Sequence, residues 1–253
     1  GLWVDYDQMT SVPGLFAVGE VDYSIHGANR LGANSLLSCI YAGMVAGPAM
    51  AKWSKGLKTH EDDLSSQLFD DAVKWHQGRI DLVQKMDGEE NPFQMGRELG
   101  DWMTKNVTVT RYNDKLLATD QKIVELQERW HRIGIKDRGQ WANQSVHYTR
   151  QLYSMLHLAR VITIGAYQRN ESRGAHYKPD YPDRDDSKFM KTTIAEYRVP
   201  STVNHAQPFG VGKDQGAPKF SYEDIDVSLV KPRPRKYDVD KSGSSNAPAS
   251  EKH

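Results

Sequence analysis

Short apolar runs and one uncharged run shape the first 55 residues of the chain. The runs from Leu2 to Tyr6 and from Leu15 to Val18 predict two strands, and the uncharged stretch 33–51 predicts a buried helix from Ser35 to about Trp53. This stretch is too rich in Gly, Ala, Asn and Ser to favour a membrane span. Two strands do not close a sheet alone, so residues 1–55 are predicted to be part of a larger domain.

Apolar residues recur at helical spacing through the next region. We expect helices over 62–86, from Asn91-Pro92 onward, over 114–133 and over 140–170, with Asn91 as an N-cap and Gly134 and Gly174 as terminators. Short connections favour an antiparallel bundle. Its large apolar residues, and the single cysteine in the earlier helix, are expected in the core: Trp75, Trp102, Met103, Trp130, Met155 and Cys39.

The last region is richer in proline. Thr192 to Tyr197 predicts one edge strand, after which the prolines at 200, 208, 218, 232 and 234 favour an extended wrap without further elements. The polar stretch Lys241 to His253 is expected to be disordered. The fold class is therefore an α-rich α/β fragment. It comprises residues 1–55 as the C-terminal piece of a larger domain, residues 56–190 as a helical domain and residues 191–253 as an extended, partly disordered tail.

Composition excludes several function classes. Lys+Arg and Asp+Glu both number 33, and no basic block of the kind that binds phosphates occurs, so nucleic acid is not an expected partner. One cysteine allows no intramolecular disulfide, and the nine histidines show no metal-ligand spacing. No metal site is expected, and no targeting segment is visible at Gly1.

The segments PGLFAVGE (13–20) and HGANRLGANSLL (26–37) carry the clearest chemical signal. They predict a strand ending at Gly19, a glycine-rich turn and a helix N-terminus with Asn34 as its cap. The free amides and positive dipole end of that helix would face an anionic ligand beside Arg30. A guanidinium in such a turn can hold a carboxylate through two parallel hydrogen bonds.

These two segments, together with RNESRGAHYKPDYPDRDD at 169–186, resemble the flavoprotein subunit of succinate dehydrogenase and fumarate reductase. The resemblance covers roughly residues 1–200 and is strongest to the Gram-positive type. It implies an enzyme that uses FAD to oxidise succinate to fumarate, or performs the reverse reaction, by hydride transfer. The glycine-rich pyrophosphate turn of such a flavin fold is absent from this sequence and is expected upstream.

The resemblance also implies residue roles. Arg30 would bind the substrate carboxylate, Glu20 the ribityl region of FAD, and the backbone of Ser35 and Leu36 would lie against the isoalloxazine ring. The helix dipole there would favour reduced flavin by on the order of a kcal/mol. The simpler alternatives are a salt bridge from Arg30 to Glu20 or Asp22, and a solvated loop acid at Glu20. No catalytic residue is assigned to this chain, because the family's substrate histidine and proton-donating arginine are expected upstream.

Partners follow from the same resemblance. An iron–sulfur subunit would accept the electrons, a membrane-anchor subunit would hold the complex to the cytoplasmic face of a bacterial plasma membrane, and the charged loop 180–186 would border the iron–sulfur subunit and lock the helical domain onto the flavin domain. Two alternatives remain open: an L-aspartate oxidase-type flavoenzyme, which shares the turn and the helix end, and a helical interaction module without catalysis.

Overall fold

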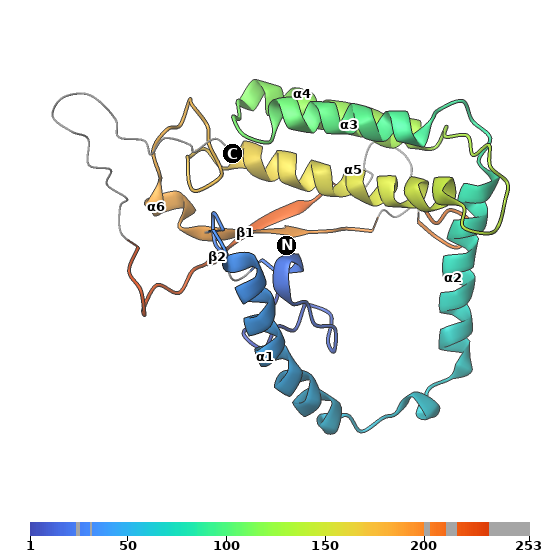
Figure 1. The fold of residues 1–253 in the computed structure, drawn as a ribbon, viewed down its shortest axis with the longest axis horizontal. Coiled ribbons are helices and arrows are strands. Elements are labelled where there is room, and N and C mark those ends of the chain that lie inside the picture. The colour runs from blue at the N-terminus through green and yellow to red at the C-terminus, as the bar shows by residue number, and fades with distance from the viewer. Residues whose placement is uncertain (24–25, 31, 200–202, 211–216, 233–253) are drawn as a thin grey trace, which may run out of the picture.

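A computed structural model describes residues 1–23, 26–30, 32–199, 203–210 and 217–232. About half of the described chain is helical, and one two-stranded sheet follows the helices (Figure 1). The elements are the 3-10 turn η1 (Gly19–Val21), α1 (Asn34–Gly56), the 3-10 turn η2 (Glu61–Asp63), α2 (Ser66–Lys85), α3 (Pro92–Asn106), α4 (Asn113–Trp130), α5 (Gln144–Gln168), α6 (Asp186–Phe189), β1 (Lys191–Glu196) and β2 (Lys219–Asp224).

Helices α3, α4 and α5 form an antiparallel bundle, whereas α2, which the sequence predicts as part of the same bundle, runs across its end (Figure 1). Asn91 starts α3 as expected, because its side-chain oxygen accepts hydrogen bonds from the amides of Phe93 and Gln94, and Pro92 occupies the first turn. Trp130 lies fully buried in the core and donates from its indole nitrogen to the carbonyl of Thr149 at 2.9 Å. The helical period therefore located both the bundle and its core.

The large residues expected in the bundle core are not all buried. Trp130 is, whereas Trp75, Trp102 and Met103 are half-buried and Met155 is 40% exposed. The prediction for Met155 is therefore wrong. Helical spacing predicts on which face of a helix a side chain lies, but position 155 lies on the edge of the face that α5 buries.

The sheet pairs β1 with β2 in antiparallel register, so that Lys191 faces Asp224 and Glu196 faces Lys219. The strand predicted at 192–197 is confirmed as β1. The expectation that no further element follows is wrong, because β2 lies between two prolines and pairs with β1 across an intervening connection. The predicted disorder over 241–253 lies outside the described residues.

The two strands predicted near the N-terminus do not form as strands. The segment makes isolated bridges instead, Leu2 with Asp22 in parallel and Met9 with Phe16 in antiparallel orientation. A strand is stable only when further strands extend the ladder, and none does so within the described residues.

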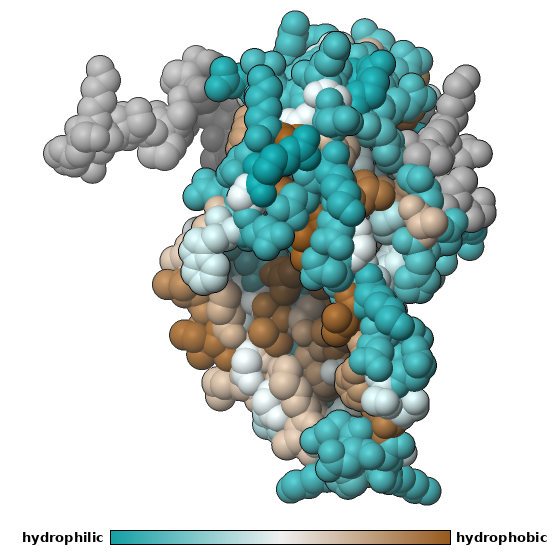
Figure 2. All heavy atoms as spheres, turned by 90° about the vertical axis from the view of Figure 1, so that its right-hand side faces the viewer, coloured by the Kyte–Doolittle hydropathy of each residue, from teal (hydrophilic) through white to brown (hydrophobic). Residues whose placement is uncertain are grey.

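Helix α1 forms where the uncharged run predicts it, but it is not a buried helix. Only its small residues Ser38, Ala42 and Ala46 are buried, along one face at a four-residue spacing. The opposite apolar side chains are 58–75% exposed: Leu36, Leu37, Ile40, Tyr41 and Met44. Cys39, expected in the core, is exposed as well. Figure 2 shows apolar side chains gathered low on the face that it presents, below the more polar bundle.

Three helix ends differ from the sequence expectations. The N-cap of α1 is Ala33, in a left-handed conformation with φ 64°, and Asn34 is already helical. Helix α5 ends at Gln168, so Gly174 lies in a separate turn and does not cap it. Helix α4 ends at Trp130, four residues before Gly134. Among the described residues, no helix is long and apolar enough to span a bilayer.

Candidate functional site

Gly19 joins the FAVGE segment to helix α1. Its φ is +76°, and a Cβ there would lie 2.9 Å from the sulfur of Cys39, so both unusual dihedrals and close approach exclude a larger residue. Both features were the predicted reasons for a glycine at this position. Cys39 lies one helical turn after Ser35, so this contact brings Glu20 to the N-terminal part of α1.

Glu20 and Arg30 both present exposed side chains. Within the described residues, Arg30 forms no ion pair, so the predicted alternative of a structural salt bridge to Glu20 or Asp22 is not seen. Glu20 lies in the 3-10 turn η1, before the turn that carries Arg30. It likewise has no side-chain partner among the residues described. Both charged groups are therefore available to a ligand.

The first turn of α1 presents free amides. Ala33 offers no side-chain acceptor, and no side chain of the described residues caps the first-turn N–H groups. Ser35 is half-buried and its carbonyl accepts the hydroxyl of Ser38 at 2.7 Å, whereas the side chain of Leu36 is 75% exposed. An uncapped N-terminus beside an unpaired arginine favours an anion.

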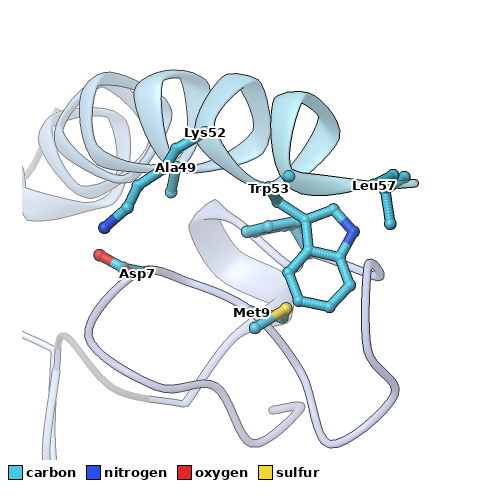
Figure 3. Close-up of a pocket in the computed structure, with 8 residues that line it drawn as sticks. Asp7, Met9, Ala49, Lys52, Trp53 and Leu57 are labelled. Carbon is cyan, nitrogen blue, oxygen red and sulfur yellow. The ribbon is translucent and has the colours of Figure 1, made fainter.

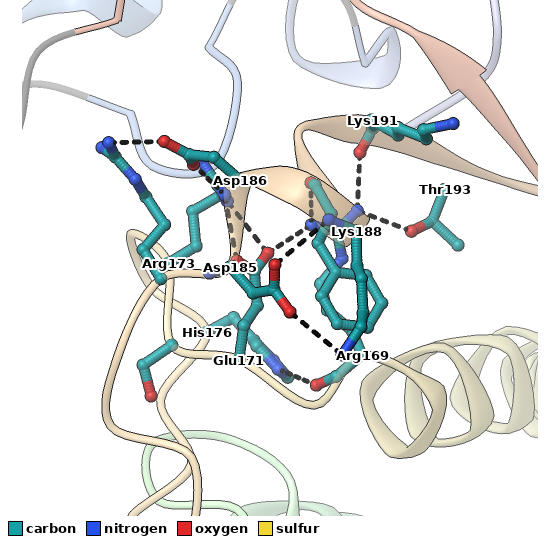
Figure 4. A network of polar contacts seen from close by, with 12 residues as sticks. Arg169, Glu171, Arg173, His176, Asp185, Asp186, Lys188, Lys191 and Thr193 are labelled. Atoms are coloured by element: carbon teal, nitrogen blue, oxygen red, sulfur yellow. Dashed lines mark hydrogen bonds and ion pairs between the residues drawn. The ribbon is translucent and has the colours of Figure 1, made fainter.

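A second polar cluster follows α5 and centres on Glu171 (Figure 4). The fully buried Glu171 carboxylate accepts hydrogen bonds from Arg169 at 2.6 Å and from Arg173 at 2.9 and 3.0 Å. The backbone amide of Asp185 donates to the same carboxylate at 2.9 Å, and Arg173 also pairs with Asp186 at 2.6 Å. Sequence reasoning singled out this block but missed Glu171 as its centre, because burial of one acid in a charged segment leaves no local signal.

Electrostatics in this cluster follow from burial and pairing. Burial alone would raise the pKa of Glu171, but the hydrogen bonds from Arg173, from the Asp185 amide and from Arg169 outweigh it and hold that pKa below its ordinary value. The carboxylate is therefore ionised at neutral pH and balances two guanidinium groups.

His176 occupies a defined tautomer beside this cluster. Arg111 has only donors, so Nδ1 of His176 accepts from it, and Nε2–H must then donate to the carbonyl of Arg169 at 2.8 Å. Burial, opposed in part by that hydrogen bond, lowers the pKa of His176 to about 4. The imidazole is therefore neutral at physiological pH.

The turn from Arg173 to His176 contacts the turn that carries Arg30. The amide of Ala175 donates to the carbonyl of Ala28 at 3.2 Å. Gly174, at φ +58°, is so close that a Cβ would lie 2.4 Å from the same carbonyl oxygen. The two sequence blocks singled out above therefore meet in space through their backbones.

A cavity of 390 Å³ lies elsewhere, between the last turns of α1 and the N-terminal loop (Figure 3). Trp53 and Met9 line its apolar part, and Lys52 points toward Asp7 at its edge. Trp53 is 17 residues beyond Leu36, or about 25 Å along the helix, so this cavity is separate from the predicted site. In the part of the chain that is described, no group of three or more His, Cys, Asp or Glu side chains is placed to hold a metal ion.

Comparison with known proteins identifies the family. Residues 96–237 match the model of the fumarate reductase flavoprotein C-terminal region, and residues 1–36 match the FAD binding domain. The chain belongs to the fumarate reductase flavoprotein C-terminal family. The FAD match ends within the first turn of α1, and it contains Glu20, Arg30, Ser35 and Leu36.

Similar proteins carry matching descriptions. The chain is 57% identical over 237 residues to the succinate dehydrogenase flavoprotein subunit of Bacillus subtilis, covering 94% of this chain and 38% of that protein. It is 33% identical to the fumarate reductase flavoprotein subunit of Haemophilus influenzae, covering 94% and 37%. A solved structure of a quinol fumarate reductase of E. coli matches with a TM-score of 0.75 at 30% identity, over 91% of this chain and 37% of that one. The chain thus spans under two fifths of the length of these relatives.

Proposed function

We propose that the protein to which this chain contributes is an FAD-dependent enzyme that oxidises succinate to fumarate or performs the reverse reaction. Oxidation removes a hydride and a proton from the two methylene carbons and leaves a carbon–carbon double bond. The observation that carries the proposal is Arg30, which has no ion-pair partner in the described part of the chain and lies beside an α1 N-terminus that no described side chain caps. Both lie within the segment that matches an FAD binding domain. A dicarboxylate substrate and an electron-rich cofactor ring both suit that charge pattern.

Arg30 is proposed to bind one substrate carboxylate. Its exposed guanidinium has no competing carboxylate among the described residues, so both N–H edges remain free for a bidentate contact. The glycines that flank the turn, Gly27 and Gly32, leave open space where a Cβ would otherwise stand. The turn can thereby admit a ligand close to the backbone.

Glu20, Ser35 and Leu36 are proposed to contact the cofactor. Bound FAD would supply the hydride acceptor. The exposed Glu20 carboxylate can accept hydrogen bonds from ribityl hydroxyls, and the first-turn amides at Ser35 and Leu36 can donate to ring oxygens. These residues fit one end of the cofactor only, because no glycine-rich pyrophosphate turn occurs in the sequence.

The chain is proposed to divide into three parts. Residues 1–55 are proposed to be the C-terminal part of the FAD-binding domain, residues 56–190 the helical domain and residues 191–253 a tail. The exposed apolar face of α1 is proposed to pack against the remainder of the FAD-binding domain, because a face with five large side chains 58–75% exposed is typical of an interface.

Partners and location are proposed on the same basis. An iron–sulfur subunit would take the electrons, since the described residues offer no cluster ligands, and a membrane-anchor subunit would hold the complex at the cytoplasmic face of the plasma membrane. The charged loop 180–186 is the proposed border with the iron–sulfur subunit. Exposed Asp and Arg side chains suit a polar interface rim there.

Direct reduction tests the proposal. The purified parent protein with its bound flavin is mixed anaerobically with succinate, and the flavin absorbance is followed. We expect bleaching by succinate and recovery on addition of fumarate. A flavin that neither dicarboxylate affects would contradict the proposal, and bleaching by L-aspartate alone would favour the oxidase alternative.

A further inference from the structure

We propose that the turn Arg173–His176 is a positioning element that fixes the substrate-binding turn at Arg30. This inference rests on the proposed role of Arg30 and extends it to residues about 145 positions away that touch no substrate. Four observations carry it: a backbone contact, a glycine that admits no side chain, a closed turn and a buried anchor.

The contact is made by backbone atoms. Ala28, two residues before Arg30, accepts a hydrogen bond of 3.2 Å from the amide of Ala175. A contact between backbone atoms fixes the path of the chain, whichever side chains the two residues carry. Because Arg30 is exposed and unpaired in the described residues, its own side chain supplies no anchor, so the path of residues 28–30 depends on such contacts.

Gly174 makes the approach possible. A Cβ at this residue would stand 2.4 Å from the oxygen, 2.7 Å from the carbon and 2.9 Å from the Cβ of Ala28. These atoms are backbone or attached directly to it, so they move only if the whole turn moves. The φ of +58° adds a second penalty for any other residue.

The turn itself is held rigid at both ends. Arg173 and His176 exchange two backbone hydrogen bonds, of 2.8 and 3.0 Å. The Arg173 guanidinium is anchored to the buried Glu171 and to Asp186, and the His176 ring to the carbonyl of Arg169. A turn so anchored can set the position of the turn that it touches.

A misplaced guanidinium keeps its charge but no longer aligns the substrate carboxylate. The proposal therefore predicts weaker dicarboxylate binding in variants of the turn, with the flavin retained. Malonate serves as the probe, because a dicarboxylate with a single methylene cannot be desaturated and reports binding without turnover. Its dissociation constant is measured in the parent holoenzyme from the change in flavin absorbance, beside KM and kcat for succinate.

Gly174→Ala is the decisive variant and Gly14→Ala its matched control. Gly14 also has a left-handed φ, of +82°, but a Cβ there would meet the Trp53 indole at the far end of α1. We expect Gly174→Ala to raise the malonate dissociation constant and KM at least 10-fold with flavin content unchanged. Gly14→Ala is expected to leave both within twofold of the parent.

Asp186→Asn supplies a milder variant, which decides the question alone if Gly174→Ala does not accumulate as folded protein. It weakens one contact of Arg173 at a side chain that is 35% exposed. We expect a threefold to fivefold rise in the malonate dissociation constant. The neighbouring Asp185→Asn is the control, because the Asp185 side chain contacts Ser187 and Lys188 and not Arg173.

Two results separate this inference from the proposed function. If Arg30→Lys loses malonate binding while Gly174→Ala and Asp186→Asn bind it as the parent does, the positioning role is wrong and the substrate role stands. If Arg30→Lys binds malonate as the parent does, the proposed function of the turn is wrong.

Discussion

The indole N–H of Trp3 donates a hydrogen bond of 3.0 Å to the carboxylate of Glu223, which lies 220 residues later in the chain. Strand β2 thereby contacts the N-terminal segment, and the Glu223 charge also acts on Tyr23: burial first, and then this carboxylate, raises the pKa of the Tyr23 phenol. The N-terminal segment thus contacts later parts of the chain here and at Ala28, which accepts from the amide of Ala175.

Removing the Glu223 carboxylate should release this tie with little loss of stability. The hydrogen bond is exposed, so Glu223→Ala is expected to cost less than about 1 kcal/mol of unfolding free energy. The Trp3 indole proton resonance should shift, and the pKa of Tyr23 should fall toward its ordinary value, both measured by NMR. Glu196→Ala, at the other end of the two-stranded sheet, should change neither. An unmoved Trp3 resonance in Glu223→Ala would argue against the contact.

Loss of the buried charge at Glu171 should be far more costly. Glu171→Gln leaves Arg169 and Arg173 without their shared carboxylate in a site without solvent exposure, so we expect a loss of about 3–5 kcal/mol. The free energy of unfolding from urea titration measures it. Glu128→Gln, an exposed position on α4, should lie within about 0.5 kcal/mol of the parent chain. Equal effects of the two substitutions would refute the assigned role of Glu171.

Stability should fall with acid in a window set by His176. The folded-state pKa is about 4, below the ordinary value of 6.5, so the unfolded chain binds more protons between these values. Stability contributed by the neutral imidazole is therefore present above pH 6.5 and is lost as the pH falls to about 4. His176→Asn keeps an acceptor for Arg111 but does not titrate.

The test compares unfolding free energies of the two chains at pH 7 and at pH 4.5. The parent should lose on the order of 2 kcal/mol more than His176→Asn over this interval. Parallel pH dependences would show that the imidazole is not buried in its neutral form.

Residues 1–253 alone should not retain FAD. Only Glu20, Ser35 and Leu36 are proposed to contact FAD. The glycine-rich turn that binds the pyrophosphate in flavin folds, and contributes much of their affinity for FAD, is absent from the sequence. The measurement is absorbance at the flavin bands after gel filtration of the chain mixed with FAD. Stoichiometric flavin eluting with the chain would overturn the assignment of these residues to one end of the cofactor.

Local signals were predictable from the sequence. Asn91-Pro92 fixes the start of α3 through one side-chain cap and one restricted φ, and Gly19 combines a positive φ with close packing on Cys39. Each signal is carried by the residue type at one or two adjacent positions. The bundle followed because helical spacing of apolar residues determines which face is buried.

Long-range relationships were not predictable in this way. The uncharged composition of α1 indicates an apolar helix, but it does not say which part of the molecule covers Leu36 and Ile40, and the described residues leave both exposed. Strand β2 forms because it pairs with β1, and the pattern of apolar and polar residues within it does not predict it. The contact of Ala28 with Ala175 joins backbone atoms, which leave no mark on residue type.

Turnover per bound flavin in two variants of the parent protein tests the central claim most directly. Arg30→Lys keeps the charge and loses the bidentate fork, so dicarboxylate turnover should fall by roughly 30- to 1000-fold, or about 2–4 kcal/mol of transition-state stabilisation, with FAD retained. Glu20→Ala should instead lose flavin, with turnover per remaining flavin near that of the parent. If Arg30→Lys turns over like the parent while Glu20→Ala keeps its flavin, this turn is not the substrate and cofactor site.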